Sequence, residues 1–246
     1  IGFWQLASSC DGISEACKAL ETPVTGGNVS LYNESKNEDN EITPINPTPV
    51  IGMVGKIDNV EKTISSEWKN INDQIWLIGS FRSEITISAS SYLEYFHGEI
   101  TGRPPKIDLL DEKFCQSFIR NAILKSFVLS SHDISDGGLA IALAECCILS
   151  GKGATVELQK DQNRYDNLLF AEGGSRIIFS IDRTKEKEWH NYLKNIQINL
   201  PSNIYVKKIG YVSSETLKIK IQDENICNIG VEELTEKFNN SISGHF

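Results

Sequence analysis

The sequence lacks the short signatures that mark the commonest nucleotide, hydrolase and metal enzymes. No glycine-rich segment ends in Gly-Lys-Ser or Gly-Lys-Thr, and no GxGxxG, GxSxG or HExxH motif is present. The six cysteines show no CxxC or Cys/His spacing of the kind that zinc sites use. Any nucleotide or metal chemistry must therefore depend on another arrangement of residues.

Basic residues and long apolar runs are also scarce. The chain carries 24 Lys and Arg against 33 Asp and Glu, which gives a formal net charge of −9. This balance argues against a general nucleic-acid binder, because phosphate contacts need clustered basic side chains. No apolar run approaches the roughly 20 residues that cross a bilayer. We therefore expect neither a nucleic-acid partner nor a membrane partner.

Methionine is nearly absent. The single methionine is Met53, and the chain begins at Ile1. Either an initiator was removed or the chain is a piece of a longer protein. Its 246 residues allow one large or two small domains.

Several cysteines lie in apolar helical patterns, where a free thiol behaves as a small hydrophobe. A secreted disulfide scaffold does not fit this length and cysteine density, so we expect a cytoplasmic protein.

Apolar spacing and helix or strand breakers predict a mixed order of elements. Helices are expected over residues 2–20, 90–96, 110–126, 139–149, 185–196 and 231–242. Strands are expected over residues 24–32, 50–57, 74–79, 127–131, 154–158, 176–181, 204–212 and 217–221. A polar loop is expected over 33–49, and the charged segment 58–73 is the best candidate for a domain junction. Without a regular βαβ rhythm, the order favours an α+β fold.

The first candidate site follows the paired Gly26 and Gly27, which allow a ligand to approach the backbone closely. Strand alternation places four polar side chains on one face: Asn28, Ser30, Tyr32 and Glu34. Such oxygen atoms suit Mg²⁺, which keeps several waters and bridges to phosphates. The alternative is a bulged strand with one solvated face.

The second candidate is the segment 132–138, His-Asp-Ile-Ser-Asp-Gly-Gly, between a predicted strand and a predicted helix. Free N–H groups at the helix start and the paired glycines can hold a phosphate, with Asp133 or Asp136 on a metal. The alternative is an ordinary N-cap by Asp136 or Ser135. Capping explains one aspartate but leaves the second aspartate and His132 unexplained.

The third candidate is the segment 170–176, Phe-Ala-Glu-Gly-Gly-Ser-Arg. Glu172 and Ser175 can face a cleft, where Arg176 would pair with a phosphate or carboxylate. The alternative is an ordinary Gly-Gly turn between a short helix and a strand.

Taken together and in this order, four segments resemble the phosphoribosylformylglycinamidine synthase family, the amidoligases of purine biosynthesis. They are residues 22–34 (TPVTGGNVSLYNE), 47–55 (PTPVIGMVG), 132–139 (HDISDGGL) and 169–176 (LFAEGGSR). In that family two tandem halves each consist of an A domain and a B domain. The resemblance implies that residues 1–61 are the C-terminal part of the second A domain, which is like aminoimidazole ribonucleotide synthetase. Residues 62–246 would be the complete second B domain, of α+β type.

The resemblance implies a reaction in which ATP phosphorylates the formamide oxygen of formylglycinamide ribonucleotide and ammonia then displaces phosphate. ATP and Mg²⁺ are the implied cofactors. The implied partners are the rest of the synthetase chain, a separate glutaminase subunit that delivers ammonia, and a small accessory subunit.

The resemblance also implies roles for particular residues. Gly27 would contact ATP, Asn28 would bind Mg²⁺ and Ser30 would contact the ribonucleotide substrate. Four residues match family motifs in the B domain, as candidate contacts to a nucleotide or phosphate or as structural residues: His132, Asp133, Asp136 and Glu172. The family's catalytic histidine, ATP-anchoring lysine and most Mg²⁺ carboxylates would precede Ile1, so no catalytic residue is expected within the chain.

Two other interpretations remain open. One is a different ATP-using member of the superfamily, like aminoimidazole ribonucleotide synthetase, although the segment 26–33 argues against it. The other is a non-catalytic module that binds nucleotides or assembles a complex. A reading frame that continues upstream of Ile1 would favour the ligase, and a start codon there would favour the module.

We expect the 246-residue chain alone to have no ligase activity. Stabilising the transition state needs the missing groups to be preorganised around the substrate. Phosphate release from ATP, formylglycinamide ribonucleotide and ammonia should therefore equal that of a protein-free control. Robust turnover by the purified chain would contradict this expectation.

Overall fold

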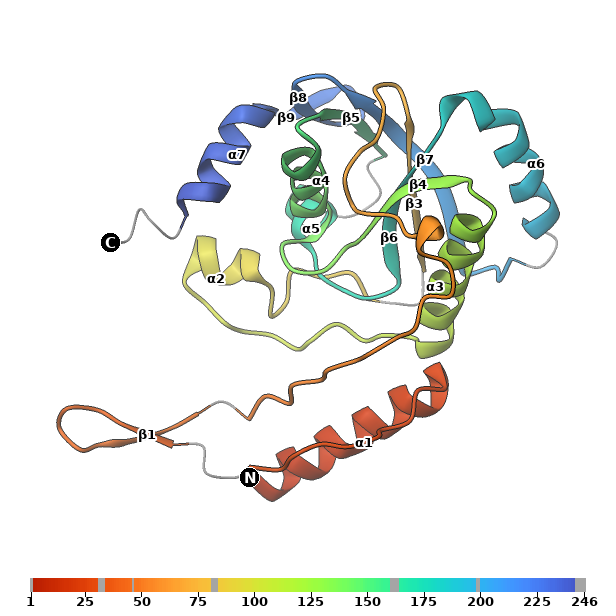
Figure 1. Cartoon of the computed structure of the whole chain (residues 1–246). Coiled ribbons are helices and arrows are strands. Elements are labelled where there is room, and N and C mark those ends of the chain that lie inside the picture. The colour runs from red at the N-terminus through yellow and green to blue at the C-terminus, as the bar shows by residue number, and fades with distance from the viewer. Residues whose placement is uncertain are drawn as a thin grey trace. The chain divides into compact units, whose positions relative to one another are not determined.

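The computed structural model describes residues 2–30, 34–45, 47–80, 84–159, 164–197 and 200–241 (Figure 1). The chain divides into two compact units, Ile1–Asp58 and Asn59–Phe246. The division lies at the start of the charged segment 58–73. None of the described helices is long and apolar enough to span a membrane.

The first unit contains helix α1 (Gly2–Leu20) and a hairpin of β1 (Glu34–Lys36) and β2 (Ile42–Pro44). The helix confirms the prediction for residues 2–20, although all its residues are exposed or half-buried. The hairpin was not predicted, because its signal is turn chemistry rather than alternation. The side chain of Asn37 closes the turn by accepting hydrogen bonds from the backbone N–H groups of Asp39 and Glu41.

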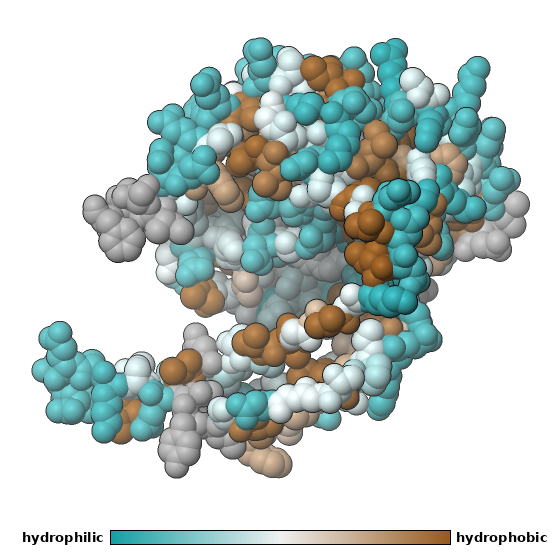
Figure 2. All heavy atoms as spheres, viewed as in Figure 1, coloured by the Kyte–Doolittle hydropathy of each residue, from teal (hydrophilic) through white to brown (hydrophobic). Residues whose placement is uncertain are grey.

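The predictions of strands over residues 24–32 and 50–57 are wrong for the described residues. Residues 22–30 and 47–57 are irregular, and Val50 and Val54 are 91% and 103% exposed. A strand requires a hydrogen-bonded neighbour, and among the described residues of this unit only β1 and β2 pair. Apolar alternation alone therefore produced no strand here. Figure 2 shows hydrophobic residues at the surface of this unit.

The second unit is built on a seven-stranded sheet with the order β4-β6-β3-β7-β5-β8-β9. Its strands are β3 (Gln74–Ser80), β4 (Val128–Asp133), β5 (Gly153–Leu158), β6 (Arg176–Ile181), β7 (Ile204–Ser213), β8 (Thr216–Ile221) and β9 (Glu224–Gly230). Only the β5–β8 pair is parallel among these described neighbours. The six strands predicted within this unit are confirmed, whereas β9 was not predicted.

Helices cover both faces of this sheet. They are α2 (Ser91–His97), α3 (Leu109–Leu124), α4 (Gly138–Ser150), α5 (Tyr165–Phe170), α6 (Glu186–Gln197) and α7 (Val231–Asn240), with short 3-10 turns at Val60–Lys62 and Arg183–Lys185. One core lies under α4 and a second lies under α3 and α6 (Figure 1). The order of helices and strands agrees with the α+β class predicted from the sequence.

Strand β3 shows why both faces must be covered, because each of its residues is buried. Ile75 and Leu77 belong to the core under α4, whereas Trp76 and Ile78 belong to the core under α3 and α6. Successive side chains of a strand point to opposite faces, so this strand contributes to the two cores alternately. The second core is rich in aromatic rings that pack edge to face around Trp189 of α6.

Candidate functional site

The first predicted site lies on the irregular segment of unit 1 that replaces the predicted strand. Here the side-chain amide of Asn28 donates a 3.0 Å hydrogen bond to the hydroxyl of Ser30, and both residues are exposed. Gly27 has open space where a Cβ would lie. Glu34 is exposed in β1, whereas Tyr32 lies outside the described residues. The structure thus brings together the residues predicted for metal and substrate, Asn28 and Ser30.

The fit of this segment to Mg²⁺ is partial. Within the described residues, no group of three or more His, Cys, Asp or Glu side chains can hold a metal ion. Mg²⁺ requires near-octahedral oxygen coordination and keeps several waters. The amide nitrogen of Asn28 is directed to Ser30, which leaves its carbonyl oxygen as one suitable ligand. Phosphates, waters and other carboxylates would have to supply the remaining ligands.

The second and third predicted sites meet in the second unit around a single cavity of about 600 Å³. The end of β4, the β4–α4 connection, the α5–β6 connection with the start of β6, and one face of α3 with the segment before it all contribute to it. Its charged and hydroxyl side chains include Glu112, Asp133, Ser135, Asp136, Glu172 and Arg176. Two motifs that are separate in the sequence therefore form one cleft.

The side chain of Glu172 accepts hydrogen bonds from the starts of two helices. Its Oε1 accepts a 2.8 Å hydrogen bond from the backbone N–H of Gly137 and a 2.9 Å hydrogen bond from that of Ser91. Its backbone forms an antiparallel bridge with Thr86. The carboxylate therefore joins the first residue of α2 to the residue that caps α4. Acidic side chains are stabilising at the start of a helix, so this contact stabilises the start of α4.

The alternative interpretation of the second motif, an N-cap of the following helix by Asp136 or Ser135, is wrong. The N-cap of α4 is Gly137, which has no side chain, and Glu172 takes the place of a capping side chain. The N–H of Gly138 donates to the carbonyl of Ser135 at 3.0 Å. Both glycine N–H groups predicted to hold a phosphate are thus occupied by groups of the protein itself.

The paired glycines have a packing role. Gly138 has a φ of +71°, and a Cβ on this residue would lie 2.7 Å from the carbonyl oxygen of Ala171. Only glycine combines this backbone conformation with so close an approach to a neighbouring backbone. The start of α4 therefore packs directly on the end of α5.

His132 is turned away from the cavity, whereas Asp133 and Asp136 line it. The Nε2 of His132 lies 3.2 Å from a carboxylate oxygen of Glu145 on α4, and its Nδ1 lies 2.6 Å from the carbonyl oxygen of Asp133. These contacts fix the imidazole between β4 and α4. Contact between His132 and a ligand stays a prediction, as it does for the two exposed aspartates.

Arg176 is a buried charge with an incomplete set of partners. Its side chain lines the cavity but is only 5% exposed, and one terminal nitrogen donates to the carbonyl of Ala171 at 2.7 Å. Within the described residues, its Nε has no hydrogen-bond partner. Burial lowers the pKa of this guanidinium, and the charges of Tyr205 and Glu172 act in the opposite direction. An anion that entered the cleft would find a positive charge there.

Glu112 was missed by the sequence reasoning. It lies in the first turn of α3, and its Oε2 accepts a 2.5 Å hydrogen bond from the N–H of Ser175. Ser175 has a φ of +60°, which is uncommon for a residue with a side chain. Glu112 therefore holds the turn of the third motif. Because 63 positions separate the two residues, no local pattern could have paired them.

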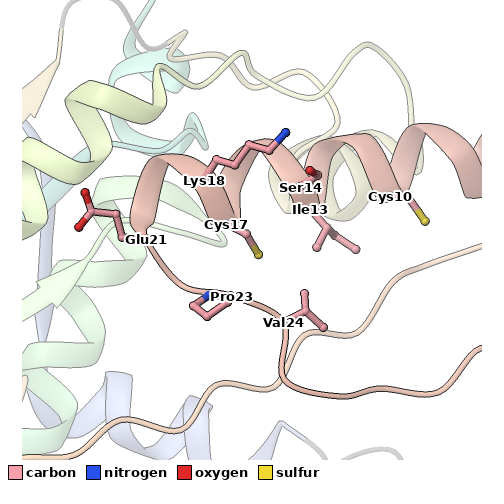
Figure 3. Close-up of a pocket in the computed structure, with 8 residues that line it drawn as sticks. All are labelled: Cys10, Ile13, Ser14, Cys17, Lys18, Glu21, Pro23 and Val24. Atoms are coloured by element: carbon pink, nitrogen blue, oxygen red, sulfur yellow. The ribbon is translucent and has the colours of Figure 1, made fainter.

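A second cavity, of about 680 Å³, lies within the first unit between α1 and the chain that follows it. Figure 3 shows the thiols of Cys10 and Cys17 on the same side of α1 as Ile13, facing Pro23 and Val24. This lining is mainly apolar, so it favours packing rather than catalysis.

A comparison with protein-family models matches residues 70–199 to the AIR synthase related protein, C-terminal domain. Curated relatives match the chain over its full length. "Phosphoribosylformylglycinamidine synthase subunit PurL" of Prochlorococcus marinus (strain MIT 9312) is 86% identical over 246 residues, and that of strain MIT 9515 is 68% identical. The chain covers 32% of each of these proteins, so it spans about a third of their length.

Solved structures resemble the fold of the chain at low sequence identity. "T. maritima PurL complexed with FGAR" matches with a TM-score of 0.57 and 14% identity, over 72% of this chain and 30% of the other. "T. maritima PurL complexed with ATP" matches with a TM-score of 0.54 and 14% identity, over 72% and 28%. At this identity the likeness supports the fold alone.

Replacing Gly138 by alanine should destabilise the second unit by about 2–4 kcal/mol, because it adds left-handed backbone strain and a backbone overlap. Gly151 at the end of α4 is a matched control. Its φ of +64° is similar, but nothing lies within 4 Å of its Cβ position. Gly151→Ala should cost only about 1 kcal/mol. Urea unfolding followed by circular dichroism measures both, and equal losses would contradict the packing role.

Proposed function

The chain belongs to the AIR synthase related protein family, whose C-terminal domain it contains, and on this basis we propose that it is part of an ATP-dependent carbon–nitrogen ligase. The ligase is phosphoribosylformylglycinamidine synthase, which acts in purine biosynthesis. The observation that carries the proposal is 86% identity to a PurL subunit across all 246 residues. The four motif segments that suggested the family lie within this match.

In this proposal the two units have different roles. Residues 1–61 are the C-terminal part of the second A domain, and residues 62–246 are the second B domain. Support comes from the exposed apolar residues of the first unit, among them Trp4, Val50 and Val54, which are 70%, 91% and 103% exposed. Apolar surface of this extent is typical of a face that packs against further protein. The relatives, which are about three times as long as this chain, contain such protein.

The proposed reaction converts formylglycinamide ribonucleotide, ATP and ammonia to formylglycinamidine ribonucleotide, ADP and phosphate. The phosphorylated formamide oxygen leaves as phosphate when ammonia forms the new C–N bond. Gly27 allows the ATP phosphates to approach the backbone, because no Cβ obstructs them. When bound, Mg²⁺ neutralises phosphate charge.

Asn28 and Ser30 connect the metal to the substrate in this proposal. Asn28 would contribute its carbonyl oxygen to Mg²⁺, and Ser30 would contact the ribonucleotide. Their 3.0 Å hydrogen bond supports the assignment, because it orients the amide of Asn28 and leaves its oxygen for a cation. A shift of either side chain would then disturb both contacts.

The cleft of the second unit is proposed to contact a nucleotide or phosphate. Asp133, Asp136 and Glu172 line this cleft, and the buried charge of Arg176 favours an anion there. His132 would act by holding β4 against α4 through Glu145 rather than by touching the ligand.

The proposed partners are the rest of the synthetase chain, a separate glutaminase subunit and a small accessory subunit. A solved structure titled "Structure of PurLQS from Thermotoga maritima" is compatible with such an assembly. Ammonia would come from the glutaminase. We place this chemistry in the cytoplasm, in keeping with six cysteines that are all free thiols.

The ligase proposal is tested with the complete protein that contains this chain. With ATP, Mg²⁺ and ammonium, it should convert formylglycinamide ribonucleotide to formylglycinamidine ribonucleotide and release one phosphate per product, as measured by mass spectrometry and a phosphate assay. Formation of aminoimidazole ribonucleotide from the amidine instead would assign the protein to the related synthetase. Phosphate release without an amidine product would exclude the ligase.

In the same complete protein, Asn28→Ala should raise the Mg²⁺ concentration needed for half-maximal activity about 10-fold, because it removes a ligand oxygen. Asn195→Ala, on an exposed position of α6, is the control and should change nothing. Activity measured as a function of Mg²⁺ at saturating ATP gives both values. An unchanged Mg²⁺ dependence would remove Asn28 from the metal site.

A further inference from the structure

The cleft of the second unit already contains an anion of the protein itself. Oε1 of Glu172 accepts the N–H of Gly137, the residue that caps the 13-residue helix α4. Backbone N–H groups at a helix start, together with the helix dipole, form a ready anion site. We propose that Glu172 occupies this site as a resident anion, and that a phosphate group of a ligand displaces it. This inference rests on the proposed phosphate role of the cleft.

Arg176 gives the displaced carboxylate a destination. It lies four positions further along the chain and lines the same cavity. Arg176 as a whole is only 5% exposed, and within the described residues its Nε has no hydrogen-bond partner. A carboxylate is the natural partner of a buried guanidinium. Both residues line the same cavity and the charge of Glu172 already acts on the guanidinium, so the structure supplies two alternative pairings for this carboxylate.

The exchange needs only a side-chain rotation. The backbone of Glu172 is held by Thr86, through N–H···O contacts of 3.1 Å and 3.5 Å in the two directions. The carboxylate can therefore leave Gly137 while its main chain stays in place. Glu112, the other inner carboxylate, is already engaged by the N–H of Ser175.

The surrounding charges explain why the resident anion matters. Asp133 and Asp136 at the cleft are exposed, so water and salt screen their charges. The carboxylate of Glu172 instead lies at the N–H that a phosphate would use, where direct competition cannot be screened. Wild-type affinity for phosphate should therefore be weak, and removal of this one carboxylate should increase it.

Displacement also affects α2. The same Oε1 accepts the N–H of Ser91, the first residue of α2, so a phosphate that displaces Glu172 removes this bond as well. Phosphate binding should keep the amide of Gly137 hydrogen-bonded, and so protected from hydrogen exchange, while it exposes the amide of Ser91. Loss of protection at Ser91 alone, with protection at Gly137 unchanged, distinguishes the exchange from binding elsewhere.

The test uses the full chain and inorganic phosphate as the probe, with affinity from calorimetry and amide shifts from NMR. Glu172→Ala should bind phosphate at least tenfold more tightly than the wild type and shift the Gly137 resonance. Glu94→Ala, at an exposed position of α2 three residues after Ser91, is the matched control. It removes the same side chain and charge without freeing the N–H of Gly137 or Ser91, and should change affinity less than threefold.

Equal gains from Glu172→Ala and Glu94→Ala would overturn the proposal, because the effect would then come from net charge alone. Absence of phosphate binding to folded Glu172→Ala would overturn it as well. If Glu172→Ala does not fold, Glu172→Gln replaces it. Glutamine keeps an oxygen that accepts both N–H groups but competes without charge, so phosphate should bind at least threefold more tightly than to the wild type.

Two further titrations of Glu172→Ala identify the source of the phosphate. Tighter binding of ADP than of inorganic phosphate supports a nucleotide, and tighter binding of ribose 5-phosphate supports a sugar phosphate. Failure of both to shift Gly137 would overturn the displacement. Such a failure leaves the ligase proposal standing, because that proposal is tested by product formation in the complete protein.

Discussion

The cleft of the second unit depends on one carboxylate. Glu172 links two segments that are distant in the sequence, residues 86–91, which contain Thr86 and the first residue of α2, and Gly137, which caps α4. Helix starts leave N–H groups without partners, and a single acceptor here serves two of them. The same carboxylate lines the cavity and occupies the N–H groups of Gly137 and Ser91 that an external anion could otherwise use. The hydrogen bonds that Glu172 accepts therefore both hold the two helix starts together and limit the binding of an anion there.

Apolar segments are buried in the second unit but remain exposed in the first. In the second unit, helices cover both faces of the sheet, so apolar periodicity and burial coincide. In the first unit, similar apolar segments stay exposed, as Val50 and Val54 show. Membership of the family, together with relatives about three times as long, accounts for this difference if the first unit is completed by other protein.

The sequence predicted most elements of the second unit because packing against a sheet selects regular apolar spacing. It missed β9 (Glu224–Gly230), in which polar asparagines interrupt the alternation. It predicted strands at 24–32 and 50–57, whose described residues are irregular, since the apolar pattern of a segment carries no information about whether a neighbouring strand is present.

The site was predictable in its residues but less so in its contacts. Asp133, Asp136, Glu172 and Arg176 were found from local motifs and do share one cavity. The capping of α4 was assigned to a nearby aspartate or serine, yet the acceptor is Glu172, 35 positions away. His132 was predicted either to contact a ligand or to be structural, and its 3.2 Å contact with Glu145 is compatible with the structural role. Long-range hydrogen bonds of this kind leave no trace in local spacing.

The strand order has a consequence for how the second unit is made. β3 is the first of its strands in the sequence but lies in the middle of the sheet, between β6 and β7. Its neighbours follow about a hundred residues later, up to Ser213. During synthesis the apolar strand Gln74–Ser80 must therefore wait for most of the unit to emerge. Such non-local pairing gives a high contact order, which slows folding and leaves a hydrophobic strand dependent on protection until its partners arrive.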